Sequence, residues 1–275
     1  MSKIQIIIDS TAYLTREEAR ENEIKVVPLS IHFEGEDFQD PFLGEFANYY
    51  ERLAGSKEFP TTSMPSIGAF VKEYQEAIDQ GKEVLVLTFS SKLSGTYNNA
   101  LIAAEMVDQD KITVIDTFTS VGNFKYMVLQ TVKMAKEGKS RQKIADFIEE
   151  QKRKMDVYFT VGSLEYLRRG GRLTNASAFI GSILNIKPII QLKNGELVGV
   201  EKTRGKKRAI DILIKKVPNY AKNICVHHIL NEKEAFEVAE ILREKCPEAD
   251  ILVEEIGPVI GSHLGPYAIG VVYTW

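Results

Sequence analysis

Short apolar runs alternate along the first half of the chain with segments whose apolar residues recur at helical spacing. The runs are rich in isoleucine, valine and leucine, and they predict buried β-strands over residues 3–9, 24–33, 83–89 and 111–116. Helices are predicted between or after these strands, over residues 15–23, 66–81, 94–107, 121–138 and 141–155. This alternation predicts a mainly parallel β-sheet with helices on both faces, which is an α/β fold.

Capping residues support two of these helices. Thr15 and Glu18 have the spacing of a capping box, in which each side chain accepts a hydrogen bond from the other residue's backbone N–H. Ser66 is predicted to be the N-cap of the next helix. Gly81 is predicted to end that helix, because glycine adopts a positive φ angle without strain.

A different pattern follows in the second half of the chain. Residues 186–202 predict a β-hairpin that turns at Asn194-Gly195. Helices and strands are then predicted in the order helix, strand, helix, strand, strand, over residues 206–216, 223–229, 231–245, 250–257 and 268–275. Asn231 and Glu234 have the spacing of a capping pair at the start of the second of these helices.

The change of pattern predicts two domains. The N-terminal α/β domain is predicted to cover residues 1–155 and to contain the mainly parallel sheet. The C-terminal α/β domain is predicted to cover residues 156–275 and to be smaller, with a mixed or antiparallel sheet. A chain of 275 residues is long enough for two such domains with a shared cleft.

Composition restricts the class of protein further. Apolar residues make up 44% of the chain and charged residues 27%, as in ordinary globular proteins, and the net charge of −3 disfavours a nucleic-acid partner. No apolar run approaches the ~18 residues that cross a bilayer, so we expect no integral membrane segment. Asp9 interrupts the first run, which therefore predicts a strand rather than a signal peptide. Cys225 and Cys246 form no disulfide framework, and the reducing cytoplasm is the expected location.

Hydroxyl-bearing residues cluster where predicted strands end and where predicted helices begin. In an open parallel sheet, ligands bind beyond the carboxyl ends of the strands, so one interpretation is that these hydroxyls converge on a ligand. The other interpretation is that each serine or threonine only caps a helix. Two clusters, at residues 61–66 and 90–96, contain more hydroxyls than one cap requires. Their candidate ligand-binding residues are Thr62, Ser63, Ser94, Gly95 and Thr96.

The motifs of several enzyme classes are missing from the sequence. Ser94 lacks the flanking glycines of a nucleophile elbow, because Lys92 and Thr96 stand two residues away on either side. Neither a phosphate-binding GxxxxGK[ST] loop nor a GxGxxG turn is present, and the histidines and cysteines have no metal-ligand spacing. What the loops predict is an anion site made of neutral donors, namely hydroxyls and backbone N–H groups at a helix start. Such a site suits a carboxylate or phosphate that is held and later released, which favours binding over catalysis.

Two later stretches contain further candidates. Arg172 follows Gly170-Gly171, and its guanidinium is suited to pairing with an anion, whereas Arg168 and Arg169 are also placed to neutralise Glu165. His263 lies in a stretch with four glycines and two prolines, residues 257–270, which predicts a loop that approaches a ligand closely. The other histidines lie within predicted strands and are expected to be structural or exposed: His32, His227 and His228.

Four of these stretches, in this order, resemble the DegV family, whose studied members include the fatty acid-binding subunits of bacterial fatty acid kinase. They are TTSMPS, FSSKLSGTYNNA, SLEYLRRGGRL and GPVIGSHLGP, and the resemblance extends from the initial IIIDSTAYL to the final GVVYTW. The resemblance implies two α/β domains with a long apolar tunnel for one acyl chain, whose carboxylate lies at the domain cleft.

The same resemblance implies roles for individual residues. Thr62, Ser94 and His263 would form the hydrogen-bonded carboxylate site, with Arg172 near the head group. Arg204 would contact the kinase. Ser262 beside the histidine is a further candidate ligand contact, although it and Leu264 stand where relatives often have threonines. Tyr267 stands where a small residue is common.

The implied function is non-catalytic and needs no cofactor. The protein would bind a long-chain fatty acid, present its carboxylate to a separate ATP-dependent kinase subunit, and deliver the acyl phosphate to an acyltransferase for phospholipid synthesis. The missing nucleotide motif fits this division of labour. Residues 179–186, apolar on nearly all sides, are candidates for the tunnel wall. Two alternatives are a hydrolase or acyltransferase with Ser94 as nucleophile and His263 as base, and a sensor of another small carboxylate or lipid.

Overall fold

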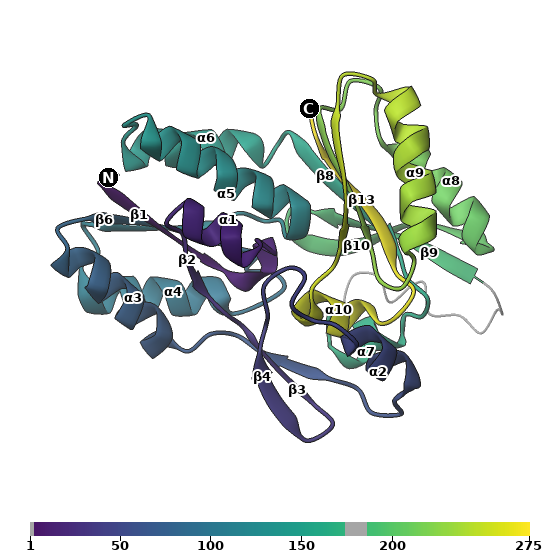
Figure 1. The fold of residues 1–275 in the computed structure, drawn as a ribbon, viewed down its shortest axis with the longest axis horizontal. Helices are drawn as coiled ribbons and strands as arrows, with labels where there is room; N and C mark the ends of the chain where they lie inside the picture. The colour runs from purple at the N-terminus through teal and green to yellow at the C-terminus, as the bar shows by residue number, and fades with distance from the viewer. Residues whose placement is uncertain (1–2, 174–185) are drawn as a thin grey trace.

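The computed structural model describes residues 3–173 and 186–275, and its first sheet has the predicted parallel arrangement (Figure 1). The sheet has the order β2-β1-β6-β7, and all neighbouring strands are parallel. Its strands are β1 (Ile4–Asp9), β2 (Lys25–Val27), β6 (Glu83–Thr88) and β7 (Ile112–Asp116). The helices around it are α1 (Arg16–Glu21), α3 (Ile67–Asp79), α4 (Thr96–Val107), α5 (Val121–Lys136) and α6 (Arg141–Gln151).

Successive residues of β1 face two different cores, as the pleat of a strand requires. Ile7 packs with Phe70 and Tyr74 of α3 and with alanines of α4. Ile6 and Ile8 point to the opposite face, which α5 and α6 cover (Figure 1). Because helices cover both faces, every residue of β1 is buried, and this explains the continuous apolar run in the sequence.

The second sheet is mixed, which confirms the predicted fold class. Its order is β10-β9-β8-β13-β11-β12, with antiparallel neighbours except for the parallel pair β11 and β12. Its strands are β8 (Met155–Thr160), β9 (Ile186–Lys193), β10 (Glu196–Arg204), β11 (Asn223–His228), β12 (Asp250–Glu255) and β13 (Ile269–Thr274). On its outer face lie α8 (Lys206–Lys216) and α9 (Glu232–Lys245) (Figure 1).

Helix α5 joins the two sheets. It packs against β1 of the first sheet and against β8, β11 and β13 of the second. Its side chains Phe124, Met127 and Val128 are completely buried in a core that includes residues of both sheets. The space between the sheets is therefore bounded on one side by a helix that contacts each of them.

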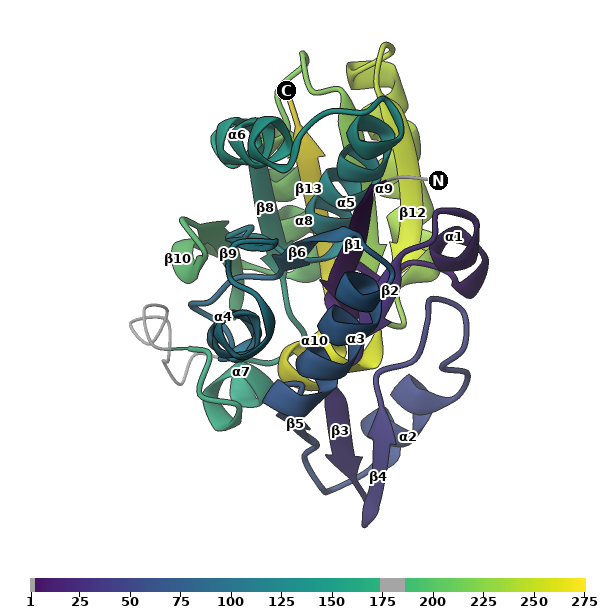
Figure 2. The same ribbon diagram turned by 90° about the vertical axis from the view of Figure 1, so that its left-hand side faces the viewer.

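A third, smaller sheet corrects one strand prediction. The run over residues 24–33 was predicted to be one strand, but it divides at Pro28 into β2 and β3 (Ser30–Phe33). Proline has no N–H for a sheet ladder, which explains the break. β3 pairs with β4 (Glu36–Gln39) and β5 (Thr61–Ser63), and Figure 2 shows this sheet at one end of the molecule near α2 (Tyr49–Gly55).

Two other predicted boundaries were wrong. The helix predicted over residues 141–155 ends at Gln151, and Met155 already begins β8. The glycine-rich stretch predicted as a loop contains α10 (Pro258–Leu264), and a further short helix, α7 (Glu165–Arg169), precedes Gly170. The glycines indicated a loop, but α10 begins with proline, whose fixed φ angle suits the first turn of a helix.

The helix caps agree with the sequence in part. Thr15 and Glu18 form the predicted capping box, and the Ser66 hydroxyl accepts the Ala69 N–H at 3.2 Å. Asn231 makes no cap, because its side chain and that of Glu234 both bind the Lys206 ammonium. The spacing of this pair was therefore a misleading signal.

A buried ion cluster connects α5 to both sides of the molecule. The Lys125 ammonium lies 2.9 Å from a Glu254 carboxylate oxygen of β12 and 3.0 Å from a Glu18 oxygen of α1. Burial alone would lower the pKa of Lys125, but the two carboxylates outweigh it and raise this pKa above its ordinary value. Lys125 therefore keeps its charge in the folded protein.

Residues 179–185 of the predicted apolar wall lie outside the described residues, and Ile186 is the first residue of β9. Within the described residues, no helix is both long and apolar enough to cross a membrane.

Candidate functional site

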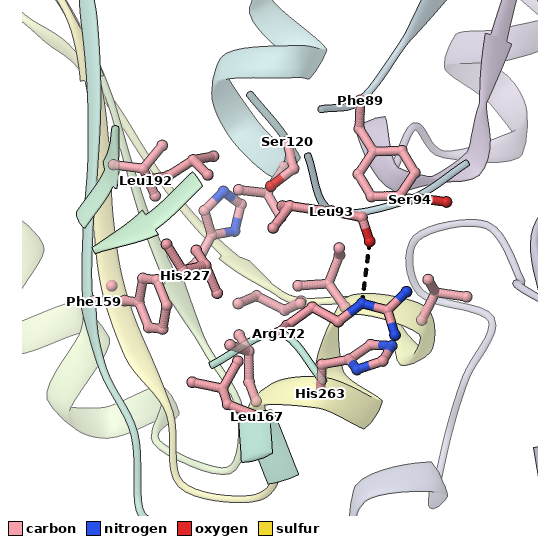
Figure 3. A pocket seen from close by; sticks show the side chains of 18 of the residues that line it. Phe89, Leu93, Ser94, Ser120, Phe159, Leu167, Arg172, Leu192, His227 and His263 are labelled. Atoms are coloured by element: carbon pink, nitrogen blue, oxygen red, sulfur yellow. Dashed lines mark hydrogen bonds between the residues drawn. The ribbon is translucent and has the colours of Figure 1, made fainter. Parts of the chain in front are cut away.

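An apolar cavity lies between the two sheets, beyond the carboxyl ends of β6 and β7 (Figure 3). The volume open to the centre of a water-sized molecule is about 90 Å³, within an envelope of about 860 Å³ that includes the gaps between wall atoms and the open mouth. Most of its lining is aliphatic or aromatic, with side chains such as Phe89, Phe159, Leu167, Leu192 and Val272. Polar side chains occur at few places in this lining, and four of them are predicted site residues.

Thr62 and His263 meet at one end of the cavity. Thr62 lies on β5 and His263 on α10, and the Thr62 Oγ1 and His263 Nε2 atoms are 2.8 Å apart. The small third sheet and α10 pack together, which positions the two side chains although 201 residues separate them in sequence.

His263 is neutral at physiological pH. Burial, and to a smaller degree the charge of Arg172, lower the pKa of His263 to about 4. Its Nδ1 atom is buried without a hydrogen-bond partner among the described residues, and the backbone of Gly170 packs against it. A buried N–H without an acceptor is unfavourable, so the ring proton belongs on Nε2, where it is donated to Thr62 Oγ1. The Thr62 hydroxyl proton is then free to be donated to a ligand.

Ser94 and Arg172 complete this end of the cavity. Ser94 Oγ accepts the Thr96 N–H at 3.3 Å and lies 2.9 Å from Thr96 Oγ1, so the loop before α4 holds the serine in place. Arg172 donates from Nε to the Leu93 carbonyl at 3.1 Å and from Nη1 to the Gly170 carbonyl at 2.5 Å. Burial lowers the pKa of the Arg172 guanidinium from its ordinary high value, but an arginine side chain is not deprotonated in proteins, so the group stays charged. A positive charge is thus fixed beside neutral hydroxyl donors.

The structure brings together Thr62, Ser94, Arg172 and His263, all of which line the cavity. Other predicted site residues lie elsewhere. Ser262 is buried on α10, where its hydroxyl donates to the Pro258 carbonyl and contacts the Tyr49 hydroxyl, both at 2.7 Å. Its position is structural, because Ser262 and His263 point in different directions from α10 and only the His263 side chain lines the cavity.

The residues beside Ser94 and Thr62 also have supporting positions. A Cβ on Gly95 would lie 2.5 Å from the Met64 sulfur, so glycine allows Met64 to cover the loop. Thr96 is completely buried and contacts Ser94, while Ser63 is exposed on β5. None of these three, unlike Ser94, belongs to the cavity lining.

The arginines before Gly170 behave as surface residues. Arg168 and Arg169 both lie 2.6 Å from Glu165, and their hydrogen bonds lower the pKa of that carboxyl to about 2. Arg204 ends β10 and is exposed in a broad surface groove beside α8. This groove is mostly basic, with Arg204, Lys206, Lys207, Arg208, Lys215 and Lys216 against Glu201 and Asp211.

Ser94 and His263 do not form a nucleophile–base pair in this structure. Ser94 Oγ is bonded to Thr96, and His263 Nε2 is bonded to Thr62. A serine nucleophile needs a histidine within hydrogen-bond reach of its own hydroxyl. The observed pairs instead each hold one hydroxyl of the cavity lining in place.

Two polar residues of the lining, Ser120 and His227, were not predicted as site residues. Ser120 is one of the hydroxyls at a strand end and was expected to cap its helix, which it does not do, and His227 was expected to be structural or exposed. His227 is buried on β11, and its Nε2 atom accepts the Gly122 N–H at 3.0 Å. Burial lowers the pKa of His227 to about 4, so this ring is also neutral. The period of a strand could have located it, because His227 shares one face of β11 with Cys225, which belongs to the core between the sheets.

Cys225, His227 and Glu254 place a thiol, an imidazole nitrogen and a carboxylate within 4.8 Å of one another. The group does not fit a metal ion. Lys125 already holds Glu254, and the Gly122 N–H on Nε2 leaves the ring proton on Nδ1, the nitrogen that faces Cys225. A cation there would meet an ammonium group and a protonated nitrogen.

Comparison with known proteins gives full-length matches. The profile of the family described as "Uncharacterised protein, DegV family" matches residues 3–274. A DegV domain-containing protein of Halalkalibacterium halodurans is 37% identical, with 98% of each chain covered, and Protein DegV of Bacillus subtilis is 34% identical, with 99% of each chain covered.

Solved structures match equally well over their whole length. The structure described as DegV, a fatty acid binding protein from Bacillus subtilis, has a TM-score of 0.88 at 33% identity, with 100% of both chains covered. A DegV family protein from Thermus thermophilus, described by its fatty acid binding, has a TM-score of 0.87 at 32% identity, again with 100% of both chains covered.

Proposed function

Because this chain belongs to the DegV family, we propose that it binds one long-chain fatty acid in the cavity between its two sheets. Its carboxylate is held by Thr62, Ser94 and His263 beside Arg172. The observation that carries the proposal is the cavity itself, whose walls are apolar and whose one end gathers these four polar residues. The relatives described as fatty acid-binding proteins support the same ligand class.

The hydrogen-bond directions at the polar end suit a carboxylate, which only accepts hydrogen bonds. The Thr62 hydroxyl accepts a hydrogen bond from His263 Nε2 and donates one of its own to the ligand. Ser94 acts in parallel, since Thr96 is placed to donate to Ser94 Oγ while the Ser94 proton is given to the second carboxylate oxygen. Arg172 supplies the opposite charge, but its Nε and Nη1 atoms donate to two backbone carbonyls. The guanidinium therefore does not offer all of its N–H groups to the carboxylate.

The apolar walls provide most of the affinity. Each buried methylene contributes about 0.8 kcal/mol, so an acyl chain of ~14 methylenes gains roughly 11 kcal/mol before the cost of association. The polar end therefore orients the ligand more than it binds it. This division allows the head group to be modified while the chain stays in the cavity.

We further propose that the protein is the non-catalytic subunit of a two-component fatty acid kinase. A separate ATP-dependent subunit phosphorylates the presented carboxylate, and the acyl phosphate is delivered to an acyltransferase for phospholipid synthesis. The sequence contains no nucleotide-binding loop, which supports a division between binding and catalysis. The basic groove containing Arg204 suits an acidic surface on the kinase subunit.

Native mass spectrometry of protein purified from bacterial cells tests the ligand. The expected result is one added mass per chain that corresponds to a long-chain fatty acid and is released by organic extraction. A purified protein that carries only polar molecules and takes up no fatty acid from vesicles would refute the proposal.

The kinase partnership has a separate test. With a fatty acid kinase subunit and ATP, Arg204→Glu is expected to slow acyl phosphate formation while fatty acid binding is unchanged. Lys233→Glu, at an exposed position on α9, is a matched charge reversal outside the groove. Equal rates for wild type and Arg204→Glu would exclude this docking surface but leave the fatty acid site intact.

A further inference from the structure

Ser120 is a polar residue in the apolar part of the cavity. It extends toward the cavity from the start of α5, apart from Arg172 and His263 (Figure 3). Only 6% of its surface is exposed. Its hydroxyl has no hydrogen bond to any residue in the described parts of the chain, although it occupies the N-cap position, where serine usually binds the helix backbone.

The reason is that a different residue binds the helix start. An N-cap serine accepts a hydrogen bond from the N–H of the second or third helical residue. Here the Gly122 N–H, the second in α5, is donated to His227 Nε2 instead. Only glycine permits this contact, because a Cβ on Gly122 would lie 2.7 Å from His227 Nε2. His227 thus takes the N–H of the second helical residue, and the Ser120 side chain makes no cap hydrogen bond.

The backbone at this point is strained in a way that maintains the arrangement. Val121, between Ser120 and Gly122, has a φ angle of 47°, a region that a β-branched residue rarely adopts. Such conformations persist only where the surrounding structure enforces them, and they concentrate at ligand sites. The strained residue directly follows Ser120, whose hydroxyl makes no cap hydrogen bond and lines the cavity.

Among residues 3–173 and 186–275, the neighbouring lining provides no partner for this hydroxyl. Val121, Val157 and Val272 are apolar, and both His227 nitrogens are engaged, with Gly122 and with Cys225. A saturated acyl chain that fills the cavity would leave Ser120 Oγ desolvated and without a hydrogen bond, which is unfavourable. A ligand that has a hydroxyl on its chain would satisfy it, since one hydroxyl both donates and accepts.

We propose that Ser120 recognises a hydroxyl group on the acyl chain, so that the cavity selects a monohydroxylated long-chain fatty acid over its saturated parent. This inference rests on the proposed function, because it assumes that an acyl chain occupies the cavity. It adds a second polar contact to the ligand, remote from the carboxylate, and names a substrate class.

The test is a competition series with the full-length protein. Stearate and monohydroxystearates with the hydroxyl at successive carbons displace a fluorescent fatty acid from wild type, Ser120→Ala and Ser66→Ala. Ser66→Ala is the matched control, because it also removes a serine hydroxyl at a helix start but lies outside the cavity. One or two neighbouring positional isomers are expected to bind wild type about fivefold to tenfold more tightly than stearate, the scale of one hydrogen bond.

That preference should be lost in Ser120→Ala and kept in Ser66→Ala. Stearate should bind wild type and Ser66→Ala with similar affinity and Ser120→Ala more tightly, because alanine has no hydroxyl to be left unpaired. Wild type that binds stearate but prefers none of the isomers would overturn the inference alone, whether or not the variant folds. A preference that persists unchanged in Ser120→Ala would also overturn it. Wild type that binds neither stearate nor any isomer would refute the proposed function itself.

Discussion

Gly170 is expected to control the position of His263, and replacing it with alanine tests the polar end of the cavity. Gly170 has φ −71° and ψ −5°, a conformation that alanine adopts readily, so its backbone alone would tolerate the change. A Cβ at this position would lie only 2.2 Å from His263 Nδ1. Ordinary contact between such atoms is about 3.5 Å, so the ring must move by about 1 Å or more.

That movement should break the 2.8 Å contact between His263 Nε2 and Thr62 Oγ1. The Thr62 hydroxyl would then lose the donor that leaves its own proton for the carboxylate. A hydrogen bond to a charged group contributes about 1.5–3 kcal/mol, so Gly170→Ala should weaken fatty acid binding by about tenfold to 100-fold. The assay is displacement of a fluorescent fatty acid, with thermal unfolding measured in parallel to confirm that the variant is folded.

Two comparisons separate this effect from general damage. Gly171→Ala strains a residue with φ 71°, but its Cβ would have no described atom within 4 Å, so the affinity should fall much less. In a His263→Ala background, Gly170→Ala should have almost no effect, because the ring that it displaces is absent. An affinity for Gly170→Ala within twofold of wild type would show that the reasoning about this contact is incorrect.

Three further results are expected. Ser94→Ala should weaken fatty acid retention by about 1–2 kcal/mol in the same displacement assay, and wild-type retention would mean that this loop only orders α4. Burial raises the pKa of Asp40 to about 7 from an ordinary 3.8. Between these pH values the folded protein holds a proton that the unfolded chain has released, so the free energy of unfolding falls as the pH rises from about 4 to 7. Denaturation curves should therefore show that Asp40→Asn gains stability relative to wild type over that interval, and a constant difference between the two would contradict the assignment. Lys125→Met leaves two carboxylates of the ion cluster without their cation and should cost about 3 kcal/mol or more in urea unfolding, whereas Lys133→Met on the exposed face of the same helix should cost little.

Local patterns predicted most helices and strands correctly because their causes are local. The run at residues 3–9 became a fully buried strand, and the Asn194-Gly195 pair turns the hairpin between β9 and β10. The helix over Lys206–Lys216 has its predicted ends. Errors occurred where a residue type that is found in two kinds of structure was assigned to only one of them. The glycines around His263 indicated a loop, but packing against the third sheet and the first residue Pro258 stabilise a short helix there.

The residues of the polar end were named from motifs, but the sequence alone could not establish that they meet. Thr62 and His263 belong to separate elements that reach one another only when α10 packs on the small sheet. Ser262, adjacent in sequence to His263, was named on the same grounds and faces a tyrosine instead, since neighbouring residues on a helix point about 100° apart.

The amino-acid sequence by itself determined the α/β class, the order of the elements and the chemistry that the chain has available, because periodicity, caps and residue types act over a few residues. Which of those groups share one cavity was decided by the tertiary structure. His227 and Ser120 belong to no distinguishing motif. Their hydrogen bonds depend on the packing of β11 beside α5, which brings His227 Nε2 to the Gly122 N–H. Hydrogen-bond partners far apart in sequence are set by how the layers pack, and no local pattern records that choice.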